Sequence, residues 1–87
     1  MKQFSYTVQD HMGIHARPAG LIVKLAKGLN SKIIIEKGEK SADARRLIAL
    51  MGLNVLQGET VTVSVEGERE AEDCQVMQSF SRRIYRS

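Results

Sequence analysis

The chain has 87 residues, a length that fits a single domain with one modest core. Its 43% hydrophobic and 26% charged residues are ordinary for a folded protein, which excludes a low-complexity chain. The net charge of +3 favours acidic partners, but two Tyr and two Phe with no Trp offer little base stacking, so we expect no nucleic-acid partner.

No apolar stretch has the length of a membrane span or of a signal peptide's core, so we expect a cytoplasmic protein without membrane insertion. The single cysteine, Cys74, cannot form an internal disulfide, which agrees with a reducing compartment. We predict one domain over residues 1–87 and a monomer.

The N-terminal third of the chain predicts a strand, a loop and a helix. Residues 4–8 alternate apolar and polar side chains with the two-residue period of a strand. A loop over 9–14 leads into a helix over 16–27, and Gly28 follows as a C-cap. The apolar face of this helix is formed by Ala19, Ile22, Val23 and Ala26.

The middle of the chain predicts a hairpin and a short helix. Three consecutive isoleucines within 32–37 indicate a strand, and a turn at Gly38 returns the chain as a short strand over 39–42. Residues 47–51 predict a helix, with Asp43 as its candidate N-cap.

The C-terminal third predicts a loop, a strand and the longest helix. Residues 54–59 form the loop, and valines alternate with polar residues over 60–66. The helix covers 68–85, with Glu72 and Asp73 on its solvent face. Its inner face is formed by Cys74, Met77, Phe80 or Ser81, and Ile84. The order β-α-β-β-α-β-α predicts a two-layer α+β sandwich with the helices on one sheet face.

The motif Gly13-Ile14-His15-Ala16-Arg17-Pro18-Ala19 precedes the first helix. Pro18 suits a first helical turn, where free backbone N–H groups and the helix dipole favour an anion. The imidazole of His15 can attack phosphorus, and the guanidinium of Arg17 can hold phosphate oxygens in a planar fork. Alone, His15 reads as a helix cap and Arg17 as a solvated side chain, but their combination with Pro18 and Gly13 favours phosphate chemistry. His11 lies four residues before His15, and a metal pair at that spacing needs a helix, so we expect no metal site.

The short helix carries more apolar side chains than it can bury. We expect Leu50 and Leu53 in the core, and some of Leu47, Ile48 and Met51 exposed to partners. Basic side chains around this patch would steer an acidic partner towards it. We predict a partner-binding surface made of Gly20, Lys24, Lys27, Arg45, Arg46, Leu47, Ile48 and Met51.

The 13–19 motif resembles the active-site signature of the HPr family, the histidine-containing phosphocarriers of the bacterial phosphoenolpyruvate:sugar phosphotransferase system (PTS). The similarity covers essentially the whole chain. The other segments that fall in the family's order are Lys40-Ser41, 47–51, Leu53, Gln57-Gly58 and the valine-rich last strand.

The resemblance implies an open-faced β-sandwich, in which three helices cover one face of a four-stranded antiparallel sheet. It implies that enzyme I, which uses Mg²⁺, passes a phosphoryl group to Nδ1 of His15, and that His15 passes it to a histidine of a sugar-specific enzyme IIA. Arg17 and the backbone of Ala16, Arg17 and Pro18 would stabilise this group. HPr proteins bind no cofactor and have no turnover of their own, so we expect a carrier rather than an enzyme.

Two positions depart from the family's pattern. Gram-positive HPr proteins carry a regulatory serine where this chain has Arg46, so HPr kinase has no hydroxyl to phosphorylate there. Arg46 also places positive charge at a helix N-terminus, which costs about 0.3–1 kcal/mol. Gly20 replaces a Thr or Ala in the first helix and weakens that helix by about 1 kcal/mol relative to Ala.

Three other functions stay open at this stage. A nitrogen-type carrier would use the same histidine for regulation, and the identity of its enzyme I would reveal it. A purely regulatory HPr-like module lacks the active histidine, so His15 argues against it. A small RNA-binding domain would need a steep salt dependence of binding.

Overall fold

The computed structural model describes residues 1–8 and 16–83, and residues 9–15 and 84–87 lie outside the described part. Its elements follow the predicted order β-α-β-β-α-β-α. The strands are β1 (Lys2–Thr7), β2 (Lys32–Lys37), β3 (Lys40–Asp43) and β4 (Thr60–Glu66). The helices are α1 (Ala16–Lys27), α2 (Leu47–Gly52) and α3 (Glu70–Arg83).

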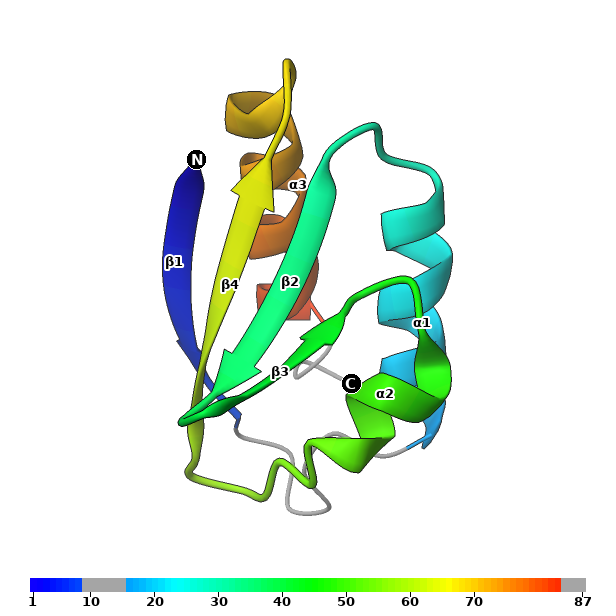
Figure 1. Ribbon diagram of the computed structural model, residues 1–87, viewed down its shortest axis with the longest axis vertical. Coiled ribbons are helices and arrows are strands. Elements are labelled where there is room, and N and C mark those ends of the chain that lie inside the picture. The colour runs from blue at the N-terminus through cyan, green and yellow to red at the C-terminus, as the bar shows by residue number, and fades with distance from the viewer. Residues whose placement is uncertain (9–15, 84–87) are drawn as a thin grey trace.

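The strands form one antiparallel sheet in the order β1-β4-β2-β3 (Figure 1). β4 lies in the interior of the sheet and pairs with both β1 and β2, and its valines alternate with polar residues because the helices cover only one face of the sheet. β2 and β3 form the predicted hairpin, and Gly38 turns it with a φ of +59°, a conformation that glycine adopts without strain.

One face of the sheet packs against the helices, and the other is open. In Figure 1, α3 lies behind β4 and β2, while α1 and α2 lie at the right of the view. The inner face contributes Ile33, Ile35, Ala42, Val61, Val63 and Val65 to the core. The open face carries polar side chains from neighbouring strands, among them the hydrogen-bonded pairs Gln3–Ser64 and Thr7–Thr60. The predicted open-faced α+β sandwich is confirmed.

The first strand covers Lys2–Thr7 rather than the predicted residues 4–8. β1 begins at Lys2, because Lys2 and Gln3 already pair with β4. Val8 lies beyond the strand but is fully buried. Its backbone is held by the loop before β4: the Val8 N–H donates to the Glu59 carbonyl (2.9 Å), and the Gly58 N–H donates to the Val8 carbonyl (2.8 Å).

The expectation that Asp43 caps α2 is wrong. Arg46 occupies the N-cap position, and no side chain caps this helix. Asp43 ends β3 instead, and its Oδ1 accepts the backbone N–H of Arg45 at 2.9 Å. A carboxylate three residues ahead of the N-cap therefore shapes the turn that leads into α2 rather than the helix itself.

The ends of the other helices differ slightly from the prediction. Gly28 follows α1, and its N–H donates to the Leu25 carbonyl at 3.0 Å, but it does not adopt the positive φ of a left-handed C-cap. α3 begins at Glu70, because the chain is still turning at Gly67, whose φ is +154°. The predicted helical residues 84–85 lie outside the described part of the chain. No helix among the described residues is long and apolar enough to cross a membrane.

Candidate functional site

The candidate phosphate site lies at the start of α1. His15 itself, like Gly13, lies outside the described residues, and α1 begins at the next residue, Ala16. Pro18 is the third residue of the helix, so the predicted place in the first turn is confirmed. This turn contains Arg17 and no acidic residue that would neutralise the positive end of the helix dipole. The backbone at this point suits a bound anion.

The burial of one face fixes α1 against the core. Ala19 and Ala26 are fully buried, and Ile22 is nearly so, as the helical spacing predicts. Lys24 and Lys27, which are predicted to belong to the partner-binding surface, are exposed. Gly20 is half-buried, and a Cβ built at this position has no neighbour within 4 Å. The helix therefore accommodates an alanine there without rearrangement.

α2 exposes the side chains that the sequence predicts. The exposed fractions are 38% for Leu47, 81% for Ile48 and 40% for Met51, whereas Leu50 is fully buried. Leu53, just beyond the helix, is also buried. A helix of six residues presents only one narrow face to the core, so most of its apolar side chains remain outside. The resulting patch of Leu47, Ile48 and Met51 is called the α2 patch below.

The two arginines before α2 have different surroundings. One terminal nitrogen of Arg45, Nη2, donates to the backbone carbonyls of Leu29 (3.1 Å) and Ser31 (3.4 Å). The Arg46 side chain is exposed and has no hydrogen bond or ion pair with any described residue. Both arginines are exposed, but Arg45 is bound to backbone carbonyls whereas Arg46 makes no such contact with a described residue, and their role as steering charges stays a prediction.

The loop before β4 is fixed by a charged side-chain network. The Lys37 ammonium lies 2.9 Å from Glu59 Oε1 and donates to the Asn54 carbonyl at 2.8 Å. The same carboxylate oxygen accepts the Leu56 N–H at 2.7 Å. The hydrogen bond from Lys37, together with the one from Leu56, lowers the pKa of Glu59 below its usual value of 4.5. This network holds residues 58–59, whose backbone forms hydrogen bonds with Val8, the last described residue before position 9.

The comparisons with known proteins agree with this arrangement. The family model of the PTS HPr component phosphorylation site matches residues 2–83. The chain belongs to the HPr family. The phosphocarrier protein HPr of Lysinibacillus sphaericus is 43% identical to it over 70 residues, which cover 80% of this chain and 80% of that protein.

Solved structures of HPr proteins share the fold. The crystal structure of HPr-C-His from Thermoanaerobacter tengcongensis has a TM-score of 0.87 and 34% identity, covering 94% of this chain and 92% of that one. The crystal structure of an HPr dimer from the same organism has a TM-score of 0.66 and 34% identity, covering 92% of this chain and 98% of that one.

The structure of this HPr family member contains a buried polar cluster that the sequence does not predict. The N–H and the hydroxyl of Ser31 both donate to Asp73 Oδ2, at 3.1 and 2.6 Å, and both residues are buried. The prediction that Asp73 faces solvent is therefore wrong, whereas Glu72 is exposed as expected. Asp73 lies four residues before Met77 and therefore on the inner face of α3, and only the tertiary approach of residue 31 to α3 gives its carboxylate a partner. We call Ser31, Asp73 and the adjacent Gly67 the Ser31–Asp73 junction.

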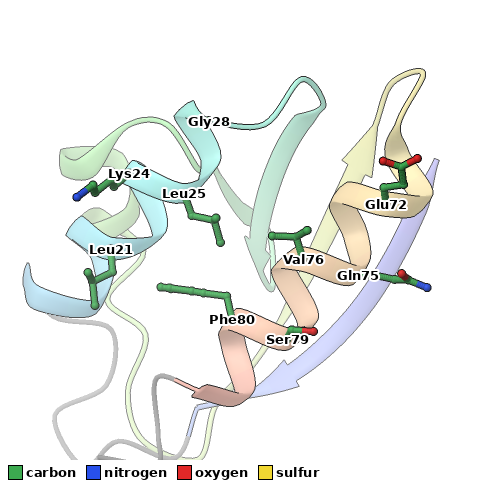
Figure 2. Close-up of a pocket in the computed structure, with 9 residues that line it drawn as sticks. All are labelled: Leu21, Lys24, Leu25, Gly28, Glu72, Gln75, Val76, Ser79 and Phe80. Carbon is green, nitrogen blue, oxygen red and sulfur yellow. The ribbon is translucent and has the colours of Figure 1, made fainter.

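A groove of about 970 Å³ separates α1 from α3 (Figure 2). Leu21 and Leu25 line it from α1, and Val76 and Phe80 line it from α3. Phe80 extends from α3 across this space towards α1 in Figure 2, which explains why it is only partly buried. Of the predicted partner-binding residues, Lys24 also lies on the groove.

The remaining chemistry-bearing residues offer no further reactive centre among those described. Residues 1–8 and 16–83 contain no cluster of three or more His, Cys, Asp or Glu side chains that could hold a metal ion. Cys74 is buried in α3, as predicted, and burial raises the pKa of its thiol. A protonated, buried thiol is a packing group rather than a nucleophile.

Proposed function

We propose that this HPr family member carries phosphoryl groups in the PTS and that His15 is the residue that accepts them. The observation that carries the proposal is the match of residues 2–83 to the family of the HPr phosphorylation site, together with a helix that begins directly after His15. The similarity to the phosphocarrier protein of Lysinibacillus sphaericus supports it. In this proposal, enzyme I is the donor and a sugar-specific enzyme IIA is the acceptor.

The transfer needs a nucleophile on the chain and a place for the anion. The lone pair on Nδ1 of neutral His15 forms a bond to phosphorus while the bond from phosphorus to the donor atom breaks, and its electron pair stays with enzyme I. The imidazolium formed can release its Nε2 proton to water and takes one back when the phosphoryl group leaves for enzyme IIA. Arg17 and the first N–H groups of α1, from Ala16 to Arg17, stabilise the phosphoryl oxygens.

The docking of both partners uses the α2 patch and the basic residues around it. An exposed apolar patch beside the free charge of Arg46 and the exposed Lys24 and Lys27 is complementary to an acidic partner with an apolar centre. Such a surface is small, which suits contacts that must form and dissociate at each transfer. Gly20, between the motif and this surface, leaves space for the approaching backbone of a partner.

The proposal has consequences for regulation and assembly. The carrier itself uses no cofactor or metal and has no independent turnover, and Mg²⁺ acts on enzyme I. Arg46 stands at the N-cap of α2 and offers no hydroxyl, so phosphorylation of a serine at this position plays no part in its regulation. We expect a cytoplasmic monomer, and sedimentation analysis tests this state because an HPr from Thermoanaerobacter tengcongensis forms a dimer.

The test is phosphorylation of the purified chain by phosphoenolpyruvate, Mg²⁺ and a bacterial enzyme I, followed by intact mass spectrometry at alkaline pH. We expect one added phosphoryl group that acid treatment removes and that enzyme IIA accepts. His15→Ala should abolish the added mass while His11→Ala, the matched control, retains it, and circular dichroism should show both variants folded. An unmodified wild-type chain beside an enzyme I that phosphorylates another HPr would refute the proposal.

A further inference from the structure

The side chain of Arg45 contacts neutral groups rather than acidic ones. Its Nη2 atom uses two N–H groups to reach the carbonyls of Leu29 and Ser31, at 3.1 and 3.4 Å. No carboxylate among the described residues forms an ion pair with it. Both bonds come from one nitrogen and end on uncharged carbonyls, so they depend on the reach and the planar N–H pair of Nη2 more than on the net charge of the side chain.

Both acceptors lie on a segment that is held firmly. Leu29 and Ser31 belong to the connection between α1 and β2. Ser31 is fully buried, and Asp73 of α3 binds its N–H and its hydroxyl from the other side. Gly67 also packs closely there, since a Cβ built on it would lie 3.2 Å from Ser31 Cα. Arg45 is therefore bound to a rigid point of the fold.

The backbone of Arg45 is fixed as well. Its N–H donates to Asp43 Oδ1 at 2.9 Å, and the next N–H, that of Arg46, donates to the Asp43 carbonyl at 3.0 Å. The residue thus connects the end of β3 through its main chain with the α1–β2 connection through its side chain. Leu47 begins α2 only two residues later, so this connection sets where the α2 patch starts.

We infer that Arg45 is a positioning residue, whose Nη2 bonds hold the start of α2 against the end of α1, whereas Arg46 presents the free charge to an acidic partner. The inference rests on the proposed function, because it assigns the two arginines different roles in docking to enzyme I. Loss of the two Nη2 bonds of Arg45 displaces the α2 patch relative to α1. Loss of charge at Arg46 leaves that geometry unchanged and weakens electrostatic attraction alone.

Lysine substitution separates the two roles, because lysine keeps the charge while its shorter side chain does not place a planar pair of N–H donors where Nη2 lies. We expect Arg45→Gln and Arg45→Lys to raise the KM for transfer from enzyme I by similar factors, about three- to tenfold, with kcat largely retained. The effect should persist at high salt. At position 46, Arg46→Lys should recover most of the KM increase caused by Arg46→Gln, and that increase should shrink at high salt. Lys32→Gln, on the open face of the sheet, controls for the loss of one charge.

A second measurement does not depend on phosphoryl transfer. In ¹H–¹⁵N spectra, Arg45→Lys should shift the amide signals of Leu29, Ser31 and α2, whereas Arg46→Lys should shift only its immediate neighbours. If Arg45→Lys kept the wild-type KM and left the α2 signals unchanged, the positioning role would be wrong. If enzyme I failed to phosphorylate even the wild type, the proposed function would fail, and the spectra would still decide whether Arg45 holds α2.

Discussion

The α2 patch and the Ser31–Asp73 junction both reverse the usual distribution of side chains. On α2, Ile48 is 81% exposed although it is apolar, and at the junction Ser31 and Asp73 are buried although they are polar. Ser31 satisfies Asp73 with two hydrogen bonds, and no buried side-chain polar atom among the described residues lacks a partner. The polar groups of the junction therefore find their hydrogen-bond partners inside the fold. The apolar side chains of the α2 patch, by contrast, can be buried only against another protein.

The largest expected effect on stability lies at the junction. Asp73→Ala leaves the N–H and hydroxyl of buried Ser31 without an acceptor, so we expect the free energy of unfolding to fall by about 2–3 kcal/mol. Urea denaturation followed by circular dichroism measures it. Glu72→Ala is the matched control, because Glu72 is the exposed neighbour of Asp73 in α3 and, among the described residues, forms a surface ion pair with exposed Arg69 that adds little stability. Equal losses for the two variants would contradict the structural role of the junction.

The same substitution at two glycines should have opposite signs. Gly67→Ala gives a residue with a φ of +154° a Cβ that lies 3.2 Å from Ser31. We therefore expect the free energy of unfolding to fall by about 1–2 kcal/mol. Gly20→Ala meets no atom within 4 Å in α1 and should stabilise the fold by about 0.5–1 kcal/mol. Thermal unfolding of both variants under one buffer gives the comparison, and a stabilised Gly67→Ala variant would show that Ser31 yields easily.

At the α2 patch we expect function to change while stability does not. Ile48→Ser removes apolar surface that is already in water, so the free energy of unfolding should change by less than about 0.5 kcal/mol. The KM for transfer from enzyme I should nevertheless rise about fivefold, because the partner loses apolar contact area. Transfer kinetics beside a denaturation curve test this, and an unaltered KM would remove Ile48 from the docking surface.

The smallest effect concerns acid stability at Glu59. Its pKa in the folded chain is lowered by the hydrogen bonds from Lys37 and Leu56, so its carboxylate stabilises the fold at pH values above its usual pKa of 4.5. This contribution is lost as the pH falls from there through the lowered pKa. Glu59→Gln should therefore make stability less dependent on pH below about pH 5. Glu39→Gln, at the exposed β2–β3 turn, is the control for the loss of one surface carboxylate.

The sequence predicts most of the fold because local patterns decide it. The bounds of α1, β2 and β4 agree with the periodicity, and the exposed α2 patch follows from the excess of apolar residues in a short helix. Asp73 and Arg45 escape prediction, since each owes its role to a segment that is distant in sequence. The N-cap prediction for Asp43 fails because a carboxylate before a helix can accept hydrogen bonds either as a cap or within the preceding turn. The motif identifies His15, which lies outside the described residues and stays a prediction.

The pairing of β1 with β4 determines the order in which the chain can fold. The hydrogen bonds Gln3–Ser64 and Thr7–Thr60 join residues that are 61 and 53 positions apart. Contacts over such separations require the closure of a long loop before any of them is gained, which slows folding. The β2–β3 hairpin, by contrast, joins neighbouring residues and can form early. Because β1 precedes β4 in the chain, it leaves the ribosome earlier and waits for β4 to emerge before it can take its place in the sheet.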